Sequence, residues 1–475
     1  MEKVTKKTAK KAVAAAAGAE KPMNAWNKYD EATLAKVNAF CEEYRKFISE
    51  NKTERECADA IVAKATKLGY KNLAECASLK AGDRVYYQMM GKAVALFVIG
   101  EKPLAEGMNI LGAHIDSPRL DVKQNPLYEK EGFALLDTHY YGGIKKYQWV
   151  TIPLSIHGVV VKKDGTKVNI SIGEKDDDPV FGISDLLIHL AGDQLGKTAA
   201  KVVEGENLDV TFASQPLNGE SKDAVLATAL DVLYKQYGIG KDDFLSAELE
   251  VVPAGKARDY GIDRSMIAGY GQDDRVCAFP SAEAIFGIKK TKRTLACLLV
   301  DKEEIGSVGA TGMHSRFFEN CVAEIAERLG QYSELTVRRA LQNSYMLSSD
   351  VSAALDPLYA DAFEKRNSAY LGRGIAFNKY TGSRGKYSSN DANAEYMATL
   401  RRIFDDADVS YHTAELGKVD QGGGGTIAYI MANYGMNVID SGVAVLSMHS
   451  PLEVTSKADI YESFKGYTAF LKGIQ

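Results

Sequence analysis

Apolar positions in the first quarter of the chain change from helical to strand-like spacing. Residues 32–68 place apolar side chains at helical intervals, which predicts an amphipathic helical region. Residues 85–99 form two short runs around Met90-Gly91-Lys92, which predicts a β-hairpin. The next apolar run predicts a strand that ends at His114. Helices and strands mixed in this way indicate an α/β domain.

Between residues 121 and 253 the pattern changes to short β runs separated by polar turns. Residues 159–170 carry Asp164-Gly165 between two apolar runs, which is a strong hairpin signal. The alternation of strands and helices resumes near Ala254. We therefore predict one α/β domain, residues 26–120 and 254–475, interrupted by a β-rich domain, residues 121–253.

Four glycines at residues 422–425 precede an apolar run, residues 427–432, that predicts a helix. Glycines before a helix can cradle an anion. The run lacks the Gly-Lys-Ser/Thr ending of a nucleotide P-loop, so close approach of the backbone to an active site is the favoured use. Residues 455–471 predict a final amphipathic helix.

Two adjacent carboxylates, Glu303 and Glu304, follow an apolar run that predicts a strand ending near Val300. Neighbouring side chains on a strand point to opposite faces, so both can serve one site only if the chain leaves the strand. Gly306 and Gly309 make that turn feasible. A metal-binding carboxylate beside one that handles protons is a recurring need of hydrolytic metal sites. Taken alone, the run is more typical of a solvated acidic loop.

Four other segments carry metal-ligand residue types near the ends of apolar runs. In the first, His114 and Asp116 would share one face of a strand, and a carboxylate commonly orients a ligating imidazole. The other segments centre on Asp273, Asp350 and His449. Each has an ordinary alternative, such as an ion pair in a turn, a helix N-cap or a structural histidine.

As a group, these imidazoles and carboxylates suit zinc or a related divalent ion. In open α/β sheets the functional residues gather at the carboxyl ends of strands, where each segment is predicted to lie. A carboxylate shared by two metals would hold a water acidified enough to attack a carbonyl near neutral pH. The group therefore indicates a hydrolytic metal site much more strongly than any one segment does.

The same segments resemble the ordered motifs of the dinuclear zinc aminopeptidase family that includes aspartyl aminopeptidase and vacuolar aminopeptidase I. The resemblance runs from about Trp26 to the C-terminus. It rests on His114-Ile115-Asp116-Ser117-Pro118-Arg119, Gly271-Gln272-Asp273-Asp274-Arg275, Asp301-Lys302-Glu303-Glu304-Ile305-Gly306-Ser307, Ser348-Ser349-Asp350 and Met448-His449-Ser450.

This resemblance implies a metalloaminopeptidase that hydrolyses N-terminal residues from peptides. It implies that two metal ions are held by His114, Asp273, Glu304, Asp350 and His449, with Asp273 bridging them. Asp116 would orient His114, and Glu303 would be the general base. Zinc is the expected metal, although cobalt and manganese tolerate the same ligands. Another dinuclear amidohydrolase, a deacylase or carboxypeptidase, and a non-catalytic assembly protein of the same fold are the alternatives.

The resemblance also implies the architecture and the assembly. The catalytic metallopeptidase domain would be a three-layer α/β/α unit of the zinc exopeptidase type, and residues 121–253 a dimerisation domain. Dimers would assemble into a homododecamer. His189 matches a histidine that reaches into a neighbouring subunit's active site, and one face of an amphipathic helix is its alternative reading.

The resemblance is looser for specificity. The acidic-specific branch usually has Asp-Asn where this chain has Asp273-Asp274, so the chain is closer to the aminopeptidase I branch. A neutral, apolar or acidic first residue therefore stays open. Lys379 and Arg384 are candidates to face a substrate carboxylate, and a solvated glycine-rich loop is the alternative for their segment.

Composition agrees with a large soluble enzyme. The 475 residues are 45% hydrophobic and can bury more than one core. The net charge of −5 is spread without a dominant block, which predicts no nucleic-acid partner. Six cysteines without Cys-x-x-Cys spacing predict reduced thiols in a cytoplasmic protein. No apolar stretch reaches the roughly 18 residues of a membrane span, and residues 1–25 predict a disordered basic tail.

Overall fold

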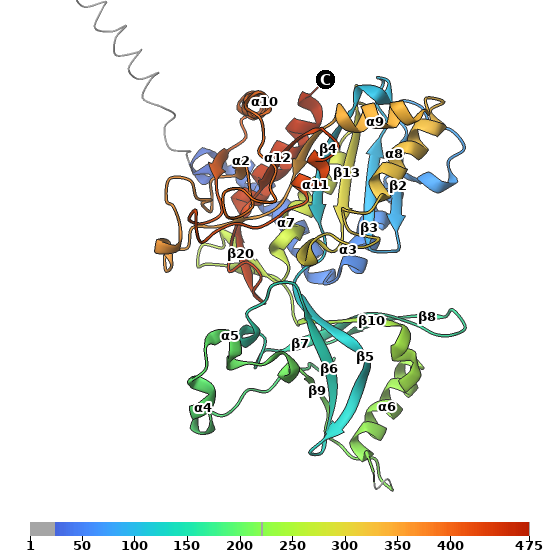
Figure 1. The fold of residues 1–475 in the computed structure, drawn as a ribbon, viewed down its shortest axis with the longest axis vertical. Coiled ribbons are helices and arrows are strands. Elements are labelled where there is room, and N and C mark those ends of the chain that lie inside the picture. The colour runs from blue at the N-terminus through green and yellow to red at the C-terminus, as the bar shows by residue number, and fades with distance from the viewer. Residues whose placement is uncertain (1–23, 220–221, 475) are drawn as a thin grey trace, which may run out of the picture.

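The computed structural model describes residues 24–219 and 222–474 (Figure 1). Residues 1–23 of the predicted basic tail, residues 1–25, therefore lie outside the described residues. Within the described ranges the strands form three sheets, of nine, six and five strands. The two larger sheets lie one above the other in Figure 1, and the chain passes from one to the other along β5.

The nine-stranded sheet is the centre of the α/β unit. Its four middle strands, β13, β4, β14 and β18, are parallel, so their carboxyl ends meet at one edge. In order across the sheet, the strands are β1 (Lys71–Asn72), β2 (Arg84–Met89), β3 (Ala93–Val98), β13 (Thr294–Val300), β4 (Met108–His114), β14 (Tyr345–Ser348), β18 (Asn437–Gly442), β16 (Ile375–Asn378) and β17 (Tyr411–Ala414).

Both faces of this sheet are covered, which explains why its strands are almost entirely apolar. Every residue of β13 is buried, and its side chains alternate between the two cores. One face packs against α2 (Glu31–Glu50), α3 (Glu54–Lys67), α7 (Gln272–Phe286), α10 (Ala394–Asp406) and α12 (Lys457–Gly473). The other packs against α8 (Phe317–Arg328), α9 (Glu334–Gln342) and α11 (Ala428–Ala432). The predicted three-layer α/β/α fold is confirmed.

The helical region predicted at residues 32–68 is two helices. The chain breaks at Asn51–Thr53 because Thr53 starts α3 with a capping box. Its side chain accepts a hydrogen bond from the Glu56 backbone N–H (3.2 Å), and the Glu56 carboxylate accepts one from the Thr53 N–H (3.1 Å). The hairpin predicted at residues 85–99 is confirmed as β2 and β3.

The six-stranded sheet is antiparallel throughout and has its own apolar core around Trp149. Its order is β8 (Lys167–Ile172), β7 (Leu154–Val161), β10 (Ala247–Pro253), β5 (Arg119–Lys130), β6 (Phe133–Tyr141) and β9 (Val210–Ala213). The hairpin predicted at Asp164-Gly165 joins β7 to β8. The sequence did not predict α6 (Ala224–Tyr237), which packs against β5, β6 and β9. Two short helices, α4 (Gly192–Leu195) and α5 (Ala199–Val202), lie between β8 and β9 in the chain. The exact domain boundaries and the dimerisation role stay predictions.

The five-stranded sheet brings distant segments of the α/β unit to the active-site edge. Its order is β11 (Arg258–Tyr260), β12 (Met266–Gly269), β20 (Glu453–Ser456), β19 (Ala444–Leu446) and β15 (Ser352–Ala353). The segments of Asp273 and His449 follow β12 and β19, so they leave this sheet and not the nine-stranded one. The candidate site therefore lies where two sheets meet.

Candidate metal centre

Four of the candidate residues lie at or just after the carboxyl ends of three parallel strands of the nine-stranded sheet. His114 is the last residue of β4 and lies beside Val300, the last residue of β13. After β13 the chain turns at Lys302, whose φ is 68°, into a short 3₁₀ helix, Glu303–Ile305. This departure from the strand lets both glutamates face the site, as the sequence required. Asp350 follows β14 on the other side of β4.

Asp273 lies between the two histidines. Its Oδ1 is 3.0 Å from Nε2 of His114, and its Oδ2 is 3.2 Å from Nε2 of His449. The Nδ1 atoms of the two rings lie 3.0 Å from the backbone carbonyls of Asp116 and Gly143 respectively. A carbonyl can only accept, so Nδ1 carries the donated hydrogen and Nε2 is left to face the centre when the ring is neutral. One carboxylate thus presents one oxygen to each imidazole.

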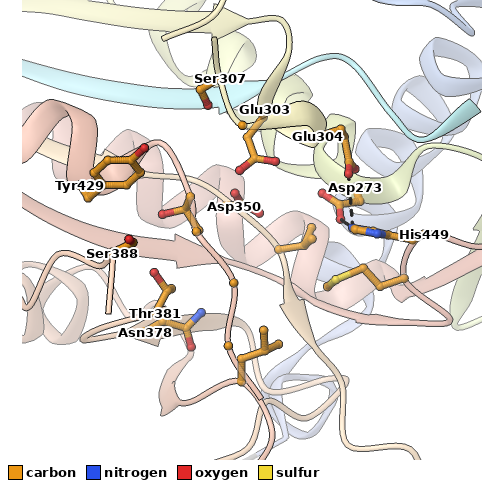
Figure 2. A pocket seen from close by; sticks show the side chains of 18 residues that line it. Asp273, Glu303, Glu304, Ser307, Asp350, Asn378, Thr381, Ser388, Tyr429 and His449 are labelled. Carbon is orange, nitrogen blue, oxygen red and sulfur yellow. Dashed lines mark ion pairs between the residues drawn. The ribbon is translucent and has the colours of Figure 1, made fainter. Parts of the chain in front are cut away.

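The remaining acidic groups complete two overlapping sets of possible ligands. Glu304 Oε2 is 3.5 Å from His449 Nε2, and Glu303 Oε2 is 3.9 Å from His114 Nε2. Potential ligand atoms of His114, Asp273 and Glu304 lie within 4.8 Å of one another, and so do those of His114, Glu303 and Asp350. Figure 2 shows Glu304, Asp273 and His449 grouped together, with Glu303 and Asp350 beside them.

The electrostatics of this cluster fit divalent cations. Burial, followed by the charge of Asp273, raises the pKa of Glu304 well above its ordinary value, and burial with the charge of Glu303 does the same to the pKa of Asp350. Burial raises the pKa of Glu303 to about 7. Glu304 Oε1 has no hydrogen-bond partner among the described residues, although it is buried. Buried carboxylates and imidazoles with free acceptor atoms are the donor set that zinc prefers.

Two buried acids, Asp116 and Glu453, contact the candidate ligands on the side away from the metal centre. Asp116, predicted to orient His114, has Oδ1 3.3 Å from Nδ1 of that ring. Its two oxygens also accept hydrogen bonds from the backbone N–H groups of Glu303 and Glu304, at 3.2 Å each. The sequence did not identify Glu453, the first residue of β20, whose carboxylate accepts from the N–H groups of His449 (2.7 Å) and Asp273 (3.2 Å). Its one visible signal is a charge at the start of a buried strand.

A cavity of about 450 Å³ opens beside the cluster (Figure 2). Its walls away from the acids are mainly small, polar or apolar residues. They include Val351, Asn378, Thr381, Ser388, Leu416, Gly423–Gly425, Thr426, Tyr429 and Met448. The glycine run at residues 422–425 therefore lies against the candidate site through its backbone, as the sequence favoured.

The three substrate-binding candidates lie elsewhere in the single chain. Lys379 is paired with Asp391 and does not line this cavity. Arg384 lines a neighbouring cavity with Tyr380 and Glu415. His189 is exposed in a 3₁₀ helix, Ile188–Leu190, so the amphipathic-helix reading is wrong. The structure gives these three residues no contact with the metal cluster, and their roles stay predictions.

Comparison with known proteins places the chain in a family. The model of the aminopeptidase I zinc metalloproteases (M18) matches residues 47–471. The chain belongs to the M18 aminopeptidase family. A probable M18 family aminopeptidase 1 from Clostridium acetobutylicum is 61% identical over 453 residues, which are 94% of this chain and 97% of that protein.

Solved structures agree with this assignment. An M18 aminopeptidase from Thermotoga maritima superposes on this M18 aminopeptidase with a TM-score of 0.93 and 44% identity, over 96% of this chain and 100% of that one. Aminopeptidase I from Clostridium acetobutylicum gives a TM-score of 0.90 and 58% identity with the same coverage. The chain is therefore a metalloaminopeptidase of a zinc-dependent hydrolase family. No helix within the described ranges is long and apolar enough to cross a membrane.

Proposed function

We propose that this M18 aminopeptidase removes N-terminal residues from peptides at a site holding two zinc ions, with Glu303 as the general base. Asp273 would be shared by both ions, with His114 and Asp350 on one side and Glu304 and His449 on the other. The position of the Asp273 carboxylate between the two imidazoles, at 3.0 and 3.2 Å, carries this proposal. Cobalt or manganese would fit the same ligands.

The chain's own residues perform the proton transfers. Bound zinc supplies Lewis acidity to the scissile carbonyl and to the attacking water. Glu303 accepts a proton from that water at a carboxylate oxygen and then delivers it to the leaving amine. Asp116 holds the Glu303 and Glu304 backbone in place during the reaction.

The cavity supports a substrate with an uncharged first side chain. None of the described residues that line it is a lysine or arginine, so an acidic side chain would find no cationic partner there. We therefore favour neutral or apolar first residues over acidic ones. Lys379 would act on substrate only if its pairing with Asp391 were broken.

We also propose that the protein self-associates through its inserted segment, residues 121–253. Leu186, Leu187, Ile188 and Leu190 are at least half exposed around His189, and such a run is typical of a surface that a partner covers. The yeast mApe1 dodecamer shares the fold at a TM-score of 0.74 and 19% identity. A homododecamer of dimers, with His189 serving a neighbouring active site, is the assembly that we expect.

Hydrolysis of matched free and N-acetylated peptides by chelator-stripped protein tests the proposal. Activity should return with added zinc, and with cobalt or manganese to different extents, and only the free-amine peptides should be cleaved. The ranking of first residues should place leucine-like and polar uncharged side chains above aspartate. Cleavage of acetylated peptides would indicate a different amidohydrolase, and inactivity with every metal would indicate a non-catalytic protein.

A further inference from the structure

The end of strand β6 reaches from the six-stranded sheet into the candidate metal centre. We propose that Tyr141 is a positioning residue for the Glu303–Glu304 loop, so that the six-stranded sheet forms part of the active site as well as an assembly surface. This inference rests on the proposed function of Glu303 and Glu304. The hydroxyl of Tyr141 donates a 2.7 Å hydrogen bond to Oδ2 of Asp116.

Asp116 connects Tyr141 to the catalytic loop. It is fully buried, and the same Oδ2 accepts from the N–H of Glu304 while Oδ1 accepts from the N–H of Glu303. A buried carboxylate that receives several hydrogen bonds has few alternative orientations. Removing the Tyr141 hydroxyl would take away one of the hydrogen bonds that fix the Asp116 carboxylate, and the two glutamate amides that donate to it would be held less firmly.

The Tyr141 ring is itself held by both parts of the molecule. Arg119 stacks over it, with its guanidinium carbon 3.9 Å from the ring centroid. The guanidinium pairs with Glu250 on β10 at 3.1 Å and with Glu54 on α3 at 3.4 Å. Phenylalanine would keep the ring and the stacking, so the substitution Tyr141→Phe removes the hydroxyl alone.

The two residues after Tyr141 contact other parts of the same site. The Gly143 carbonyl accepts from Nδ1 of His449 at 3.0 Å. A Cβ atom on Gly142 would meet the Cβ and Oε2 of Glu304 at 3.3 Å, and the φ of Gly142 is 75°. Three consecutive residues thus touch Asp116, Glu304 and His449, which is difficult to explain if the sheet served assembly only.

Hydrogen exchange of the metal-free protein tests the positioning role without using activity. In Tyr141→Phe, exchange of the Glu303 and Glu304 amides should become about 10-fold faster. That factor corresponds to about 1.4 kcal/mol, which is near the lower end of what a hydrogen bond to a charged group contributes. Tyr128→Phe is the matched control, because it removes a tyrosine–aspartate hydrogen bond, to Asp209, on neighbouring strand β5. Unchanged exchange in Tyr141→Phe, or the same increase in the control, would overturn the inference.

Kinetics at saturating zinc separate positioning from a general loss of structure. In Tyr141→Phe, kcat should fall about 10-fold with KM within twofold of the wild-type value, and the control should match wild type. In an Asp116→Asn background the same substitution should add less than twofold, because the hydroxyl acts through Asp116. An unchanged kcat, or full additivity, would overturn the inference. An inactive wild-type protein would instead refute the proposed function, and the exchange comparison would still test the positioning.

Discussion

Replacing Glu303 by glutamine tests the assignment of the general base. Glutamine has the same shape and can still accept a hydrogen bond, but it cannot take a proton from water. The backbone N–H of residue 303 would keep its hydrogen bond to Asp116, since that bond does not involve the side chain. The substitution therefore removes the base with little change to the surroundings.

The expected loss is large and confined to kcat. General-base catalysis contributes about 10²–10⁴-fold, which corresponds to about 2.7–5.4 kcal/mol of transition-state stabilisation. Glu303 is outside the proposed set of zinc ligands, so zinc content should stay at the wild-type level. KM for a free-amine peptide should change little, because Glu303 is proposed to transfer the proton and not to bind the substrate.

The assay pairs steady-state kinetics with metal analysis, and Glu304→Gln is the control. That variant makes the same chemical change one residue later, but it replaces a proposed ligand and should lose zinc as well as activity. A Glu303→Gln variant with kcat within about threefold of wild type would refute the role of base. Loss of zinc from Glu303→Gln equal to that from Glu304→Gln would move Glu303 into the ligand set.

Three further predictions address other parts of the molecule. Asp273→Ala should remove at least one of the two expected zinc ions per subunit and abolish activity, because both imidazoles lose the carboxylate that they share. If metal analysis showed that the variant still holds two ions tightly, Asp273 would not be the bridging residue. Glu453→Ala should lower the free energy of unfolding by about 1.5–4.5 kcal/mol, since the buried N–H of Asp273 loses its acceptor at about 1–3 kcal/mol and the part-buried N–H of His449 loses a hydrogen bond that contributes about 0.5–1.5 kcal/mol. A metal-free variant whose denaturant unfolding curve matches that of the metal-free wild type would contradict this. The third concerns pH: burial lowers the pKa of His157, but hydrogen bonds to Glu174 and Glu56 outweigh it and raise that pKa above its ordinary value. A histidine whose pKa is higher in the folded state than in the unfolded state stabilises the folded protein. This stabilisation is complete below the unfolded-state pKa of about 6.5 and is lost as the pH rises through the folded-state pKa. The apparent Tm should therefore decline with rising pH above neutrality in wild type and decline less in His157→Gln, and equal slopes would show that this residue does not contribute.

Local patterns were sufficient to predict several elements of the α/β unit. The hairpin of β2 and β3 and the strand ending at His114 depend on period-two spacing and turn residues, which lie close together in the chain. The predicted helical region differed only by the break before α3, although the Thr53 and Glu56 capping signal was present in the sequence. Helix α6 was not predicted, because the apolar runs around it resembled the strands of the inserted segment.

The sequence by itself determined which residue types the site contains, because imidazoles and adjacent carboxylates after apolar runs are a property of the chain alone. Only the tertiary structure decided how they meet: β12 and β19 belong to a second sheet, and their packing sets Asp273 between His114 and His449. Lys379 pairs with Asp391 and does not line the cavity. Tyr141 gave no local signal, since its hydrogen bond to Asp116 joins residues 25 positions apart. Glu453 gave only a charge at the start of a buried strand; it lies four residues from His449, but its bond to the Asp273 N–H spans 180 positions. Such contacts follow from the packing of whole elements, and no short window of sequence contains both partners.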